Sequence, residues 1–179
     1  MATVALHTAP DGLLAAVAPL GCASAAPTAL VIDLDQGGLP LPGRRTLRDL
    51  VEEGPTGTDL RPTRTGVACL PNGGIGYLAA RDVVGALQDA WPFVVLRVGE
   101  EDSIPEGAAG IAVRPLLPGA RPADLLPTLY QPLGFAEDQA PPTGHRLPPL
   151  PGRVARSLLA GRRSRAAWVR AWSIVWQAR

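Results

Sequence analysis

The chain of 179 residues contains no lysine, and all 17 of its basic residues are arginine. This absence removes the side chain with which a phosphate-binding loop reaches the β- and γ-phosphates of a nucleotide. Cysteine and histidine are also scarce, with two of each, and neither pair has the C-x-x-C or Cys/His spacing of a zinc site. We therefore expect no bound metal and no cofactor.

Other functional classes are excluded by what the chain lacks. None of its five serines lies in a G-x-S-x-G motif, so no hydrolase triad is indicated. The acidic run at residues 99–107 lacks the alternating oxygen ligands of a calcium loop, and we interpret it as a solvated loop. The longest uncharged run, residues 12–32, is interrupted by Pro19, Gly21 and Pro27 and follows no basic segment. We therefore expect neither a signal peptide nor a membrane span, and a cytoplasmic protein. From the missing motifs we expect no catalytic residues.

Short apolar runs separated by glycine and proline, 20 of each, indicate many short elements. Strands are expected at residues 3–8, 29–35, 66–70, 93–98 and 110–116. Helices are expected at residues 13–24, 45–53, 79–90 and 122–130. This alternation predicts an α/β fold with a parallel, doubly wound sheet of about five strands and short flanking helices. The residues expected in the middle of the sheet are Val31, Ile32, Val94, Val95 and Leu96.

Charge and proline content divide the chain into three segments. Residues 1–135 form the expected α/β domain, residues 136–152 a proline-rich extended connector, and residues 153–179 a basic helix with a weak point at Gly161. Residues 1–152 carry ten arginines and all 16 acidic residues, for a net charge of −6, whereas the tail carries seven arginines and no acidic residue. This segregation predicts that the tail meets an anionic surface, which can be a membrane, a nucleic acid or the acidic body of the protein.

Three of the four tryptophans recur every four residues in the tail. On a helix they span about 80°, and two arginines fall on the opposite side, so the tail is expected to be a basic amphipathic helix over residues 162–179. Its tryptophan face can pack on the protein's own sheet, which we favour, or bind a membrane surface, a protein partner or a nucleic acid. The residues expected to bind a partner or a membrane are Arg163, Arg170, Trp168, Trp172 and Trp176.

The apolar strand ALVIDLD, residues 29–35, ends in two aspartates one residue apart. At the carboxyl end of a parallel strand, Asp33 and Asp35 can hold Mg²⁺ and its waters beside a phosphate. Alternatively they cap the strand, hydrogen-bond to the turn at residues 36–38, and pair with Arg97 if the sheet order brings the fourth strand close. We favour the second interpretation.

Four segments, in this order, resemble pieces of the deviant-Walker P-loop family of MinD, ParA and the CpaE/TadZ-type localisation proteins. They are VIDLD at 31–35, GVACLPNGG at 66–74, WPFVVLRV at 91–98 and HRLPPLPGRVARSLLAG at 145–161. The resemblance implies a P-loop fold and a role in placing a pilus, secretion or cell-division machine. It also permits two uses of the tail, because MinD-type proteins end in a membrane-targeting amphipathic helix and ParA-type proteins bind DNA through basic surface residues.

The chain differs from this family at the positions that bind nucleotide and metal. The loop TAPDGLL, residues 8–14, has one glycine and no lysine, and Asp11 puts a negative charge where a triphosphate would lie. Arg97 stands where the family has its metal-linked aspartate. Asp33, Asp35 and Arg97 are therefore expected to be vestigial, and phosphoryl transfer loses both its positioning and its charge stabilisation.

These departures predict a pseudo-ATPase that acts as a non-catalytic adaptor. Its partner would be a protein, either a true ATPase or a component of a pilus or secretion machine, and it can lie peripherally at the inner membrane face. Two alternatives stay open: a working nucleotide hydrolase with an unrecognised loop, and a nucleic-acid-binding module that uses the arginine-rich helix. The sequence also leaves a homodimer open.

Overall fold

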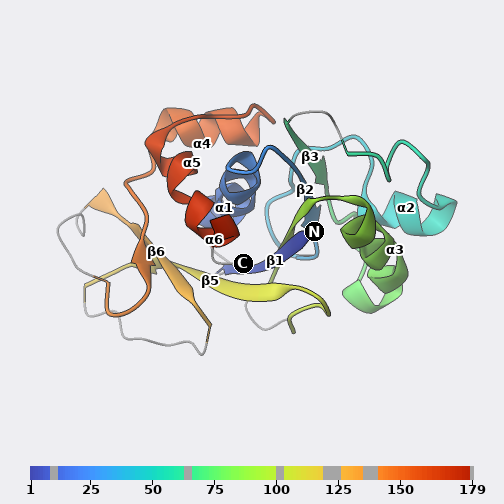
Figure 1. Ribbon diagram of the computed structural model, residues 1–179, viewed down its shortest axis with the longest axis horizontal. Coiled ribbons are helices and arrows are strands. Elements are labelled where there is room, and N and C mark those ends of the chain that lie inside the picture. The colour runs from blue at the N-terminus through green and yellow to red at the C-terminus, as the bar shows by residue number, and fades with distance from the viewer. Residues whose placement is uncertain (9–11, 63–65, 100–102, 119–125, 135–140, 178–179) are drawn as a thin grey trace.

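The computed structural model describes residues 1–8, 12–62, 66–99, 103–118, 126–134 and 141–177 (Figure 1). Several expectations lie wholly or partly outside these residues. They concern Asp11, the middle of the acidic run at 100–102, the first part of the helix expected at 122–130, residues 136–140 of the connector, and the last two residues of the tail.

The described residues form one parallel sheet of seven strands in the order β3-β2-β4-β1-β5-β6-β7. Its strands are β1 Ala2–Thr8, β2 Thr28–Asp33, β3 Gly66–Leu70, β4 Phe93–Val98, β5 Ala109–Leu116, β6 Thr128–Pro132 and β7 His145–Arg146. The predicted α/β class and parallel sheet are confirmed. The sheet is wider than the five strands expected, because β6 and β7 add to its β5 side.

The helix expected at residues 122–130 is wrong from Thr128 onward. Residues Thr128–Pro132 form β6, and all five are buried. β-branched Thr128 and aromatic Tyr130 suit a strand packed on both faces, and the run was too short to separate a buried strand from a helix by periodicity. The short β7 lies in the expected proline-rich connector and pairs with β6, and Leu147 donates its N–H to the Tyr130 carbonyl at 2.8 Å.

Helices cover both faces of the sheet. Figure 1 shows α1 (Gly12–Ser24), α4 (Gly152–Leu159), α5 (Ala167–Ala171) and α6 (Ser173–Gln177) gathered on one face, apart from α2 (Leu47–Glu53) and α3 (Tyr77–Ala90). One buried cluster joins the first group to the sheet and a second cluster joins α2 and α3 to it. A capping box starts α2, since Thr46 Oγ1 accepts from the Asp49 N–H at 3.2 Å and Asp49 accepts from the Thr46 N–H at 2.7 Å.

The centre of the sheet lies where the sequence placed it. Strand β4 runs between β2 and β1, and the five predicted core residues are fully buried. Val95 packs on the α1 side, whereas Val94 and Leu96 pack on the side of α2 and α3. A parallel strand enclosed on both faces reads as a continuous apolar run, which is why this part was predictable.

Candidate functional site

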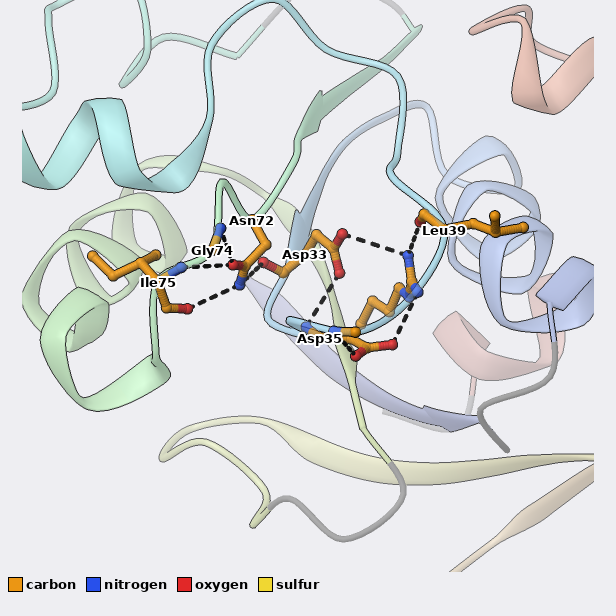
Figure 2. Close-up of polar contacts among 8 residues, drawn as sticks. Asp33, Asp35, Leu39, Asn72, Gly74 and Ile75 are labelled. Atoms are coloured by element: carbon orange, nitrogen blue, oxygen red, sulfur yellow. Dashed lines mark hydrogen bonds and ion pairs between the residues drawn. The ribbon is translucent and has the colours of Figure 1, made fainter.

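The candidate site lies at the carboxyl ends of β2 and β4. These neighbouring strands are parallel, and Asp33 of β2 is paired in register with Arg97 of β4. Arg97 Nη1 lies 3.4 Å from Asp33 Oδ2, and both side chains are buried. The predicted pairing of Asp33 with Arg97 is confirmed, and Figure 2 shows how Asp33, Asp35 and Leu39 gather at this edge.

The loop after β2 folds back over the Arg97 guanidinium. Arg97 Nη2 donates to Asp35 Oδ2 at 2.9 Å, and Nη1 donates to the Leu39 carbonyl at 2.6 Å. The side chain of Arg97 has no exposed surface. A Cβ at Gly38 would overlap the guanidinium, so only glycine allows the loop to pass so closely. The loop therefore encloses a cation that belongs to the protein itself.

Both aspartates also hydrogen-bond to the backbone of the loop that follows β2. Asp33 Oδ1 accepts from the Asp35 N–H at 3.2 Å, and Asp35 Oδ1 accepts from the Gly37 N–H at 2.9 Å. The expected hydrogen bonding to the turn at residues 36–38 is therefore confirmed at Gly37. All four carboxylate oxygens have a partner within the protein.

Asn72 joins this site to the neighbouring loop, and the sequence analysis did not identify it. Its Nδ2 donates to the Asp33 carbonyl at 3.2 Å and to the Ile75 carbonyl at 3.0 Å. Its Oδ1 accepts from the N–H groups of Gly74 and Ile75 at 2.7 and 2.8 Å (Figure 2). The PNGG turn was the available signal, because asparagine side chains commonly close such turns through backbone hydrogen bonds.

Burial raises the pKa of Asp33 to about 6, and the charge of Arg97 offsets only part of this shift. Arginine stays protonated in proteins. Above that pKa an ionised Asp33 carboxylate faces the Arg97 guanidinium, and below it the Asp33 carboxyl group is neutral. A buried carboxylate that already pairs with a guanidinium is a weak ligand for Mg²⁺.

The shifted pKa of Asp33 predicts how stability depends on pH. Because the folded state holds this proton more tightly than the unfolded state, the contribution of Asp33 to the free energy of unfolding falls as pH rises from about 4 to about 6. In Asp33→Asn this contribution is absent. We therefore expect the free energy of unfolding of the variant, relative to that of the wild type, to increase by a few kcal/mol over that pH interval. Urea unfolding at each pH measures the difference.

Comparing the two proteins at each pH removes the effect of other titrating groups. Two such groups, Asp49 and Asp59, have a lowered pKa and act in the opposite direction in both proteins. A constant difference in the free energy of unfolding between wild type and Asp33→Asn across this interval would contradict the assignment.

The tail does not form the single helix expected over residues 162–179. In the described part the chain turns after α4, and α5 and α6 are separated at Trp172. Trp168 and Trp172 are buried against α1, with ring centroids 5.5 Å apart. A Cβ at Gly21 of α1 would overlap the Trp168 ring, so the helix backbone and the indole are in close contact. The predicted internal cover of the tryptophan face is confirmed for these two rings, although helix α1 contacts them where only the sheet was expected.

Two of the three indole nitrogens in the tail also donate hydrogen bonds to the rest of the protein. Trp168 Nε1 donates to Gln131 Oε1 at 2.5 Å, and Trp176 Nε1 donates to the Cys22 carbonyl at 3.0 Å. The half-buried Trp176 packs edge-on against Phe93 of β4, with ring centroids 5.2 Å apart. The three tryptophans are therefore structural elements of the fold.

The expectation that Arg163 points away from the body is wrong. Its Nη2, Nε and Nη1 donate to the carbonyls of Ala26, Ser24 and Pro27 at 2.6, 3.3 and 3.3 Å. Helical spacing misplaced this side chain because the chain is not helical at residue 163. Arg163 thus caps the C-terminal end of α1. Arg170 is exposed as expected, and its Nη1 donates to the Arg165 carbonyl at 2.7 Å.

No family model, curated protein or solved structure matches this chain. Within the part of the chain that the structure describes, three or more His, Cys, Asp or Glu side chains nowhere gather as a metal would require. The helices of that part are all too short or too polar to cross a membrane.

Proposed function

We propose that the protein is a non-catalytic adaptor, built on a degenerate MinD/ParA-like domain whose nucleotide site is replaced by an internal arginine. The observation that carries this proposal is the Arg97 guanidinium, which is fully buried and bonded to Asp33, Asp35 and the Leu39 carbonyl. In open α/β sheets, ligands bind beside the carboxyl ends of the strands. Here a side chain and a folded loop occupy that position between β2 and β4.

The arrangement around Arg97 supports a loss of metal binding and of phosphoryl transfer. First, the positive charge that a metal ion would bring to Asp33 and Asp35 is supplied by Arg97, so a metal would have to displace a buried ion pair. Second, phosphoryl transfer depends on positioning and charge stabilisation by a metal and a lysine. The chain has no lysine, and a carboxylate set that is already bonded throughout offers little to either task.

In this proposal the protein acts through its surfaces. The partner is a protein, in line with the family resemblance: a true ATPase or a component of a pilus, secretion or division machine. The tail is part of the core, so its tryptophans are not the contact. Exposed leucines follow four strands at the carboxyl edge of the sheet and offer an alternative contact surface. They are Leu13 after β1, Leu39 after β2, Leu117 after β5 and Leu133 after β6.

The proposal predicts that the purified protein does not hydrolyse ATP or GTP above the rate of a buffer blank. The test is release of inorganic phosphate with Mg²⁺ present, with Asp35→Ala as the matched control. Asp35 is chosen because its carboxylate is partly exposed, whereas that of Asp33 is buried. Turnover by the wild type that disappears in Asp35→Ala would refute the adaptor proposal in favour of a nucleotide hydrolase.

A further inference from the structure

A cavity of about 440 Å³ lies between the end of α1 and residues 163–173 of the tail. Three arginines and three serines line it, and none of the acidic residues that the structure describes does. They are Arg163, Arg165, Arg170, Ser24, Ser164 and Ser173. The remaining lining residues are Ala25 and Val169. A cavity with this lining presents hydrogen-bond donors and positive charge to whatever enters it.

Most of the donors in this cavity are not used within the protein. The Arg165 side chain makes no hydrogen bond or ion pair with the residues that the structure describes, and Arg170 uses one N–H, for the Arg165 carbonyl. Ser164 Oγ accepts from the Ala166 N–H at 3.3 Å, which leaves its hydroxyl proton to donate. A guanidinium has five N–H donors, so Arg165 and Arg170 offer several directed donors each.

The positive charge here is also not balanced by nearby acids. The ion pairs found among the described residues all involve Arg45 or Arg97, neither of which lines this cavity. No acidic residue follows Asp138 in the sequence, so the tail itself supplies no counter-charge. Three guanidinium groups around one cavity give it a positive potential that attracts anions.

Arg163 removes the obstacle that the end of α1 would pose to an anion. The carboxyl end of a helix carries partial negative charge on its free carbonyls. Arg163 donates to three carbonyls in this turn, those of Ser24, Ala26 and Pro27. It therefore neutralises the helix end and fixes its own guanidinium at the cavity wall, while Arg165 and Arg170 stay available to a ligand.

We infer that this cavity is a phosphate-binding site, in which Arg165 and Arg170 bind the phosphate oxygens and Arg163 is a positioning residue. Guanidinium groups match phosphate oxygens in geometry as well as in charge. The phosphate can be that of a soluble metabolite or of a lipid headgroup. This inference goes beyond the proposed function, because the 13 residues of α1 place the cavity about 20 Å from the carboxyl edge where Arg97 lies.

The test uses the full chain and inorganic pyrophosphate as the probe. We expect saturable shifts of the Arg165 and Arg170 Nε–H resonances in a nuclear magnetic resonance titration. In the double variant Arg165→Gln/Arg170→Gln, the dissociation constant should rise at least about tenfold, since charge-assisted hydrogen bonds are lost. The control with the same charge change is Arg153→Gln/Arg156→Gln, because both arginines are exposed on α4 and do not line the cavity. It should bind like the wild type.

A second arm distinguishes the two sources of phosphate. Vesicles of phosphatidylcholine with phosphatidylglycerol are compared with pure phosphatidylcholine vesicles in a sedimentation assay. Sedimentation with the anionic vesicles, lost in Arg165→Gln/Arg170→Gln, assigns the site to a lipid headgroup, and pyrophosphate binding without sedimentation assigns it to a soluble phosphate. Absence of both kinds of binding, or equal binding by the double variant and its control, overturns the inference. Neither result bears on the Asp35-dependent hydrolysis that tests the proposed function.

Discussion

Replacing Arg97 with leucine is expected to lower the free energy of unfolding by about 3 to 5 kcal/mol, the usual effect of removing one partner from a buried ion pair. Asp33 and Asp35 would then face each other without a counter-charge, and the Leu39 carbonyl would lose its donor. Lysine should not restore stability, because a compact ammonium cannot reach these three acceptors as a planar guanidinium does. Urea unfolding at neutral pH measures the difference.

A rescue experiment separates the charge effect from a packing effect. If unpaired carboxylates cause the loss, adding Asp33→Asn and Asp35→Asn to Arg97→Leu should recover a substantial part of it. A triple variant as unstable as Arg97→Leu alone would show that packing of the arginine stem, and not its charge, stabilises this edge. An Arg97→Leu protein as stable as the wild type would contradict the buried network altogether.

Deleting the chain after Gly161 is expected to abolish cooperative folding. Trp168 and Trp172 are buried, and each indole removes on the order of 200 Å² from water. At about 25 cal/mol per Å² the two rings contribute roughly 10 kcal/mol, which is comparable with the whole stability of a domain, about 5 to 15 kcal/mol. The deletion also uncovers α1. The truncated protein should bind a hydrophobic dye and show no sharp transition in calorimetry.

Two single substitutions compare how much individual tryptophans contribute to the free energy of unfolding. Trp172→Ala should cost about 3 to 5 kcal/mol, as large-to-small core changes do, whereas Trp176→Ala should cost less because its ring is only half-buried. A truncated protein that melts cooperatively near the wild-type temperature would mean that the tail is not part of the core.

The sequence predicted best where residues are enclosed on both sides. The runs around Val31 and Val95 contain little except apolar residues, which is typical of the middle of a parallel sheet. The Asp33–Arg97 pair followed from strand ends that share an edge. β6 was missed because TLYQP is short and bounded by prolines, so neither period is resolved in five residues.

In the tail, residue spacing predicted the buried face but not the path of the backbone. Tryptophans at every fourth residue indicated one face, and that face is buried, yet the backbone is two short helices that bend at Trp172. Arg163 was misplaced because a helical wheel assigns a direction even where the chain is not helical. The role of Asn72 could not be predicted from the spacing of apolar residues, because it depends on the contact between two loops.

In the proposed adaptor, Arg97 takes the place of bound metal and nucleotide at the carboxyl edge of the sheet. Calorimetric titration of Mg-ATP tests it most directly, with Arg165→Gln/Arg170→Gln as the titrated protein so that phosphate binding at the far end of α1 adds no heat. Our account predicts no saturable heat at the millimolar ATP concentrations of a cell. A micromolar dissociation constant that weakens in Asp35→Ala would contradict it.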